Sequence, residues 1–277
     1  MHGIDLERPD GGRGNRMPVL FIGHGSPMNA IETNDFTRAL NALGERLPRP
    51  RSILCISAHW MTEGTWITAM PRPRTIYDFY GFPKALFEVQ YPAPGSPEFA
   101  KLVHETVRDP QVHLDSENWG LDHGTWSVLR HLFPKADVPV MQLSVYIEQP
   151  GPYHLQLGEQ LRPLRDQGVL IIGSGNIVHN LRQIIWGEDA RPYDWAVEFD
   201  EWSKAKLEAR DFKALAEAYL DTPAGRLSIP TPDHYYPLLP VLGASDVQDD
   251  MTFEFEAIHN ASISMRAVSF GLKERSV

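Results

Sequence analysis

Short, nearly continuous runs of apolar residues recur along the chain and alternate with stretches that have helical spacing. Such runs are typical of strands that are buried on both faces of a sheet. The pattern predicts strands at residues 17–23, 51–58, 65–70, 111–114, 138–144, 169–173, 252–257 and 263–270. It predicts helices at residues 34–47, 96–107, 125–133 and 152–166, two more within 193–219, and a partly helical segment at 231–243. This alternation indicates a single α/β domain with a central, mostly parallel sheet flanked by helices.

Two segments fall outside this alternation. Residues 1–16 are polar and glycine-rich and lack the apolar core of a secretory signal, so we expect a disordered tail before a folded domain at 17–277. Residues 71–97 are rich in proline and aromatic residues. Loops of this length are often functional. This one is expected to be a packed loop that covers the sheet, a wall of a substrate pocket, or both.

Composition narrows the classes of protein. The formal net charge is −10 and the sequence has no block of lysine and arginine, which argues against a nucleic-acid partner. No apolar stretch reaches the roughly 18 residues that span a bilayer, so we expect no membrane partner. The single cysteine, Cys55, falls in a predicted buried strand, where a core role is expected. One unpaired cysteine fits a cytoplasmic protein.

Histidines at the ends of the predicted strands carry the candidate chemistry. His24, His59 and His179 follow three of the apolar runs. Because ligands of parallel sheets bind outside the carboxyl ends of the strands, these imidazoles are expected to share one site. Neutral imidazole is a common metal ligand. A set of imidazoles without thiolates suits zinc, ferrous iron, copper or nickel, and composition alone does not choose among them.

Two more histidines belong to the candidate site. Thr231 and Pro232 are typical of a helix start and would place His234 in the first turn, although Pro237 allows the helix to begin later. His123 lies at the start of a predicted helix rather than after a strand, and a proton-transfer or substrate-holding role suits it better than ligation. Competing motifs are incomplete: the segment 173–175 lacks the third glycine of a dinucleotide loop, and no phosphate-binding loop is present.

Seven segments, taken together and in this order, resemble the class III extradiol ring-cleavage dioxygenases (the LigB-like superfamily), and most closely the DOPA 4,5-dioxygenase branch. The segments are Phe21–Met28, Ser57–Trp60, Tyr77–Pro83, Tyr91–Pro97, Asp122–Trp126, Ser174–Asn180 and Thr231–Tyr235. The resemblance implies an oxidoreductase that opens the ring of a catechol such as L-DOPA with O2, so the expected partners are a small-molecule catechol and dioxygen.

The resemblance also implies roles for the five histidines. His24, His59 and His234 would ligate one divalent metal ion, His179 would be a fourth ligand or an acid/base beside it, and His123 would face the substrate. More distant members of the superfamily use two histidines and a carboxylate. The all-histidine set found here would favour Zn2+ in purified protein, whereas ring opening would require non-haem Fe2+, since zinc has no redox chemistry.

Two other functions remain open from the residues alone. A zinc-dependent hydrolase could use the same histidines to activate water, and a non-catalytic metal-binding protein would need only the ligands. The loop 71–97, with Trp60 and Trp126, is expected to supply apolar walls for an aromatic ring. Three arginines are candidates to pair with a substrate carboxylate: Arg72, Arg74 and Arg182. The sequence gives no prediction of oligomeric state.

Overall fold

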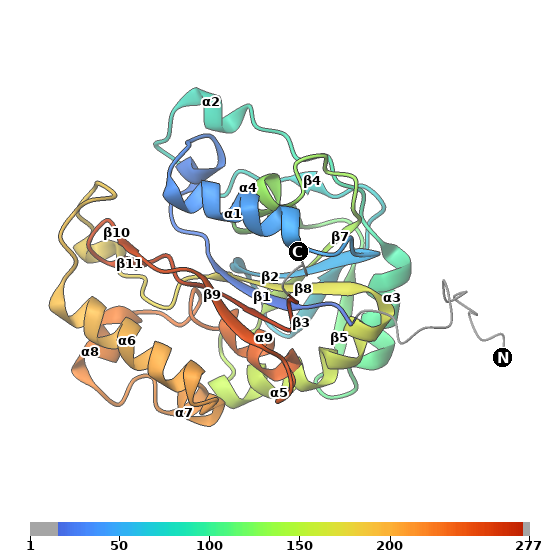
Figure 1. The fold of residues 1–277 in the computed structure, drawn as a ribbon. Helices are drawn as coiled ribbons and strands as arrows, with labels where there is room; N and C mark the ends of the chain where they lie inside the picture. Colours follow the sequence, from blue (N-terminus) through green and yellow to red (C-terminus); the bar gives the residue numbers. More distant parts are fainter. Residues whose placement is uncertain (1–15, 274–277) are drawn as a thin grey trace.

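A central sheet of eight strands organises the chain in the computed structural model, which describes residues 16–273 (Figure 1). The expected tail lies outside the described residues except for Arg16. The strand order is β5-β3-β7-β2-β8-β1-β12-β9. These strands are β1 (Val19–Gly23), β2 (Ser52–Met61), β3 (Thr65–Thr68), β5 (Val112–Asp115), β7 (Val140–Val145), β8 (Val169–Gly175), β9 (Met251–Phe255) and β12 (Ala267–Phe270). Four shorter strands form two separate pairs: β4 (Arg74–Thr75) with β6 (Gly120–Leu121), and β10 (Ile258–His259) with β11 (Ile263–Ser264).

The middle of the sheet is parallel and its two sides are mixed. Strands β7, β2, β8 and β1 are mutually parallel. Beyond them, β12 and β9 continue the sheet in antiparallel pairing, and β3 pairs antiparallel with β7 but parallel with β5. The predicted α/β class with a mostly parallel sheet is therefore confirmed. The parallel strands bring the carboxyl ends of β1, β2 and β8 to one edge.

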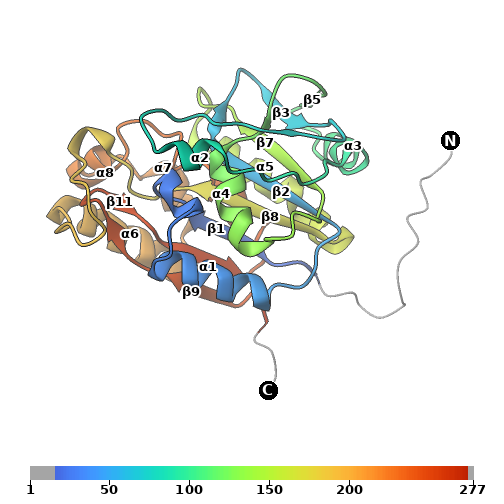
Figure 2. The ribbon, with the colours of Figure 1, turned by 90° about the horizontal axis from the view of Figure 1, so that it is seen from above.

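Helices cover both faces of the sheet, as Figures 1 and 2 show. Alternate residues of β1 and β8 feed two separate cores: Phe21 and Ile171 belong to one, Leu20 and Ile172 to the other. This two-sided burial explains why the strands are continuously apolar. The helices on the face of α1 are α1 (Asp35–Arg46), α2 (Lys84–Phe87) and α4 (His123–Leu132). Those remaining are α3 (Pro97–Thr106), α5 (Gly151–Leu161), α6 (Asp194–Glu208), α7 (Phe212–Glu217), α8 (Pro223–Ser228) and α9 (Leu238–Ala244). Three 3₁₀ turns complete the described elements: Pro27–Ala30, Arg162–Gln167 and Leu181–Gln183.

Several predicted boundaries are wrong. Strand β2 continues to Met61, so His59 lies within the strand instead of after it. Of the two starts left open for the helix near His234, the later one is observed: residues before Leu238 form turns, and α9 begins beyond Pro237, because proline inside a helix donates no helical hydrogen bond. The stretch expected as the strand 263–270 is divided into β11 and β12. The loop 71–97 contains the short elements β4 and α2.

The buried position of Cys55 is confirmed. Its side chain is 1% exposed, and burial raises the pKa of the thiol to about 12. Among residues 16–273, no helix combines the length and apolar character needed to cross a membrane. The cytoplasmic location stays a prediction.

Candidate metal centre and substrate cavity

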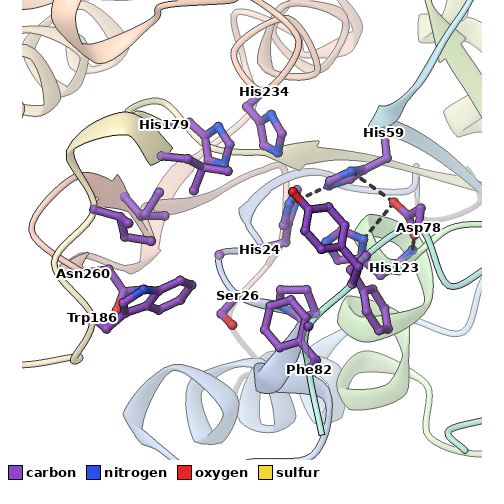
Figure 3. A pocket seen from close by; sticks show the side chains of 18 residues that line it. His24, Ser26, His59, Asp78, Phe82, His123, His179, Trp186, His234 and Asn260 are labelled. Atoms are coloured by element: carbon purple, nitrogen blue, oxygen red, sulfur yellow. Dashed lines mark hydrogen bonds and ion pairs between the residues drawn. The ribbon is translucent and has the colours of Figure 1, made fainter. Parts of the chain in front are cut away.

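The five candidate histidines converge on one small region (Figure 3). His24 directly follows β1, His59 lies near the end of β2, and His179 follows β8. His123 is the first residue of α4, and His234 lies in the turns before α9. The ring centres of His24, His59 and His234 are 5.1, 5.3 and 4.9 Å apart in pairs. Side chains that are far apart in the sequence therefore surround one point at the edge of the sheet.

A buried hydroxyl fixes the orientation of the His24 ring. The Nδ1 atom of His24 lies 3.0 Å from Ser174 Oγ, and that hydroxyl donates its own proton to the Gly124 carbonyl at 2.5 Å. Ser174 Oγ therefore accepts a hydrogen bond from His24 Nδ1–H. With the proton on Nδ1, the Nε2 atom of His24 presents a lone pair to the centre of the cluster.

Two aspartates do the same for the other rings. Asp78 Oδ2 lies 3.1 Å from His59 Nδ1 and 2.8 Å from His123 Nδ1, while Asp78 Oδ1 accepts from the His123 backbone N–H at 2.9 Å. Asp233 accepts from His234 Nδ1. A carboxylate that holds the far nitrogen of an imidazole is the usual support of a metal ligand. The sequence interpretation missed Asp78, Asp233 and Ser174, although all three lie in segments that carry the family resemblance.

The facing nitrogens of His24 and His59 fit a bound cation. Their Nε2 atoms are 3.1 Å apart. Because both rings carry their proton on Nδ1, neither Nε2 can donate to the other, and two lone pairs meet. Two nitrogens bound to one zinc or similar ion at about 2.0–2.1 Å each lie about 2.9–3.4 Å apart. The separation in this protein therefore suits a shared metal ion.

Burial keeps these imidazoles neutral. Desolvation, followed by repulsion from the neighbouring histidines, lowers the pKa of His24 and of His59 well below the ordinary value. Desolvation is also the main cause of the lowered pKa of His179. Neutral imidazole is the form that binds a metal ion, so ligands are available here at neutral pH. Two sets of side chains in the described structure are close enough to hold an ion: His24, His59 and His123, and His179, Asp233 and His234.

A glycine allows the His234 turn to approach the sheet. A Cβ atom at Gly175 would lie 2.1 Å from the His234 carbonyl oxygen. The backbone N–H of Asn176 donates to that same carbonyl at 2.8 Å. Only glycine leaves room for this contact, which brings His234 over the carboxyl end of β8.

The histidines form one wall of a cavity of about 420 Å³. Its other walls are mainly apolar and include Phe79, Phe82, Leu181, Ile184, Trp186 and Ile263. The loop 71–97 has both expected roles. Tyr77 packs against Trp126 with ring centres 6.1 Å apart, whereas Phe79 and Phe82 line the cavity.

Some expected wall and pairing residues lie elsewhere. Trp60 does not line the cavity but stacks on Trp119, with ring centres 5.7 Å apart. Trp126 is fully buried and donates to the Ile76 carbonyl. None of the arginines proposed to bind a substrate carboxylate lines the cavity: Arg72, Arg74 and Arg182. Among the described lining residues there is no lysine or arginine at all.

Comparison with known proteins agrees with this geometry. Residues 19–272 match the catalytic LigB subunit of aromatic ring-opening dioxygenase. The chain belongs to the LigB family. It is 49% identical over 261 residues to a 4,5-DOPA dioxygenase extradiol of Escherichia coli, covering 92% of this chain and 95% of that one. A Beta vulgaris protein of the same name is 37% identical over 257 residues, covering 91% and 94% of the two chains.

A solved structure supports the same assignment. The crystal structure of an uncharacterized protein from Escherichia coli K12 superposes with a TM-score of 0.81 at 45% sequence identity, covering 92% of this chain and 100% of that one. The LigB-family protein described here is a metal-dependent extradiol ring-opening dioxygenase, an oxidoreductase acting on a small aromatic molecule with O2. The resemblance inferred from the seven segments is confirmed.

Proposed function

We propose that the protein opens the ring of a catechol such as L-DOPA beside its two hydroxyl groups, with Fe2+ as the active metal. The names of the related proteins, 4,5-DOPA dioxygenase extradiol, support this substrate class. The observation that carries the proposal is a triangle of imidazoles, His24, His59 and His234, at the base of an apolar cavity. An apolar cavity with a few convergent polar groups suits a flat aromatic ring.

The spacing of the rings supports His24, His59 and His234 as the ligands. The centre of an imidazole lies about 3.2 Å from a metal ion bound through one of its nitrogens, so rings around one tetrahedral ion stand about 5 Å apart. These three rings are 4.9–5.3 Å apart. The ring of His123 is only 4.0 Å from that of His59, which is too close for both to bind one ion along their lone pairs.

The same argument separates His179 from the ligands. Its ring stacks on that of His234 with centres 3.5 Å apart and an interplanar angle of 9°. Stacked rings do not direct two nitrogens at one ion. We therefore assign His179 to proton transfer, and its lowered pKa leaves it neutral and able to accept a proton.

His123 is placed to act on a substrate hydroxyl. Its Nδ1 atom is held by Asp78, so Nε2 is the free acceptor, and the residue lines the cavity. A proton taken by His123 Nε2 would create an imidazolium that the Asp78 carboxylate stabilises at 2.8 Å. Asp78 would thus orient a ligand and support an acid/base residue at once.

The iron would supply the redox chemistry that these side chains lack, since ferrous iron binds both catechols and dioxygen and zinc does not change oxidation state. The protein's own groups hold the ring against Phe79 and Phe82, limit water in the cavity and accept the substrate protons. We expect Zn2+ to occupy the same ligands in protein purified in air, without ring opening.

Loading the protein with Fe2+ under anaerobic conditions, then adding air and L-DOPA, tests the proposal. We expect a yellow ring-opened semialdehyde, followed by visible absorbance and mass spectrometry, with consumption of one O2 per product. The Zn2+-loaded protein should form none.

Absence of product with every catechol tried would contradict the proposal. Oxygen-independent hydrolysis of an ester or amide by the zinc form would favour the hydrolase. Metal binding without turnover of any kind would favour a non-catalytic metal-binding protein.

A further inference from the structure

A second, polar cavity adjoins the histidine-lined one. It has a volume of about 610 Å³ and shares four lining residues with the first: Ser26, Phe82, Trp186 and Asn260. Its other lining residues are mostly polar and include Asn29, Glu32, Thr33, Asn34, Glu188 and His259. Whatever occupies the apolar cavity can therefore extend past Trp186 and Asn260 into polar surroundings.

Asn260 lines both cavities and has an unused hydrogen-bond donor. The residue is 9% exposed, and its side-chain oxygen accepts from the Gly187 N–H at 2.9 Å. Its side-chain nitrogen has no hydrogen-bond partner among residues 16–273 and is not enclosed by protein. In Figure 3, Asn260 and Trp186 lie on the opposite side of the cavity from Asp78. A nearly buried amide with a free NH2 group points to an acceptor on a ligand.

Asn260 is also fixed in place by its backbone. Its N–H donates to the Gly187 carbonyl at 3.1 Å, and its carbonyl accepts from the Ile185 N–H at 3.1 Å. The φ angle is +52°, a region in which asparagine is enriched over most other residues. The donor is therefore held rigidly, as expected of a group that selects a ligand.

Glu188 presents a carboxylate to the polar cavity. One of its oxygens accepts from the buried Asn34 amide at 2.6 Å, which leaves the other oxygen available. Among the described lining residues of this cavity, His259 is the one basic side chain. Burial is the main cause that lowers its pKa, so it is neutral at neutral pH. Asp35 and Asp189 lie near enough to act on His259 as well. The polar cavity is thus suited to a positively charged group.

We infer that Asn260 and Glu188 form the subsite for the polar side chain of the catechol, with the Asn260 amide donating to its carboxylate and Glu188 accepting from its ammonium group. The inference rests on the proposed catechol cleavage and adds the recognition of an amino-acid side chain. With no arginine in either cavity, the carboxylate would be bound by a neutral donor. Catechols whose side chain carries only a carboxylate would then be poor substrates. The polar cavity would place that group near the carboxylates of Glu32 and Glu188, with no lysine or arginine among the described lining residues to balance the charge.

Four catechols that differ only in the side chain test this inference. They are L-DOPA, dopamine, 3,4-dihydroxyphenylpropionate and 4-methylcatechol, which carry both charges, the ammonium only, the carboxylate only, and neither. We expect Glu188→Gln to lower kcat/KM for L-DOPA and dopamine roughly tenfold relative to 4-methylcatechol, as the loss of a charge-assisted hydrogen bond predicts. Asn260→Asp keeps the acceptor for Gly187 and the backbone preference but replaces the donor by an oxygen. Asn260→Asp should lower kcat/KM relative to 4-methylcatechol for L-DOPA and not for dopamine.

Glu198→Gln is the matched control, because Glu198 is exposed on α6 and lines neither cavity. It should leave all four ratios unchanged. Equal effects of Glu188→Gln on all four catechols, or no effect on any, would overturn the inference. Calorimetric binding of the same four compounds to the Zn2+-loaded protein gives the ratios without turnover, so the subsite can be disproved even if ring opening fails.

Discussion

Each candidate ligand in this protein has a partner that decides which nitrogen carries the proton. Ser174, Asp78 and Asp233 accept from the Nδ1 atoms of His24, His59 and His234, respectively. The burial that lowers the pKa of His24 and His59 would not by itself choose between the two tautomers. The acceptors do, and they leave the Nε2 lone pairs of His24 and His59 facing each other at 3.1 Å, with the His234 ring centre 5.3 and 4.9 Å from those two rings.

At this scale we predict which histidines hold the metal. His234→Ala should reduce bound Zn2+ or Fe2+ from about one ion per chain to less than about a tenth, since a ligand is lost. His123→Ala and His179→Ala should retain the ion but lose at least about 100-fold in kcat, the usual range for removal of a proton-transfer group. Metal content after reconstitution and dialysis, measured by mass spectrometry, distinguishes these outcomes. Full metal content in His234→Ala, together with loss of metal in His123→Ala, would show that the ligands are instead His24, His59 and His123.

At the scale of elements, the site depends on how closely the His234 turn approaches β8. The sequence favours a helix from Thr231, but the helix begins at Leu238, and the preceding turns bring the His234 carbonyl to the Asn176 N–H. Gly175 makes this contact possible. Gly175 lies in a strand, where glycine packs poorly, but here it gives the His234 turn room to reach the proposed metal centre.

Gly175→Ala should therefore lower metal affinity by at least about tenfold, because the added Cβ pushes the turn away and moves His234. Competition with a chromophoric chelator measures this change. Gly44→Ala is the matched control: its Cβ would meet the Leu132 carbonyl oxygen at 2.6 Å, between α1 and α4, away from the site. It should lower Tm but leave metal affinity intact. Equal affinities in both variants would remove Gly175 from this role.

At the scale of the whole molecule, one of the histidines outside the site links stability to pH. His154 on α5 is 2% exposed and packs on Tyr236 with ring centres 4.3 Å apart. Its Nε2 atom has no hydrogen-bond partner within residues 16–273. Burial lowers the pKa of His154 to about 4. As the pH falls, His154 therefore takes up a proton near pH 6.5 in the unfolded chain but only near pH 4 in the folded chain.

Stability should fall as the pH falls from about 6.5 to 4, and His154 should account for up to ~3 kcal/mol of that loss. His154→Phe keeps a ring against Tyr236 and removes the titration, so its free energy of unfolding should depend less on pH over this range. Denaturant unfolding of both proteins at a series of pH values gives the difference, in which the other histidines cancel. Parallel curves would show that His154 does not titrate as inferred.

Much of the fold follows from local patterns. Three strands lie close to where the apolar runs predict them: 19–23, 140–145 and 169–175. A strand that is covered on both faces is apolar at every position, so the sequence shows it as a continuous apolar run. Boundaries near the site were less predictable. Strand β2 continues past the apolar run and includes His59. It does so because Met61 pairs with Val145 of β7, and the apolar pattern of the sequence does not show this pairing.

The sequence by itself determined the α/β class, the five histidines and the family, because apolar periodicity and short motifs are written in neighbouring residues. Only the tertiary structure decided which groups face one another. Asp78 contacts the Nδ1 atoms of two histidines, and Gly175 leaves room for the turn that carries His234. Asn260 and Glu188 line one cavity because distant segments of the chain pack there. Distances between such segments depend on how the whole chain is packed, and no local pattern encodes them.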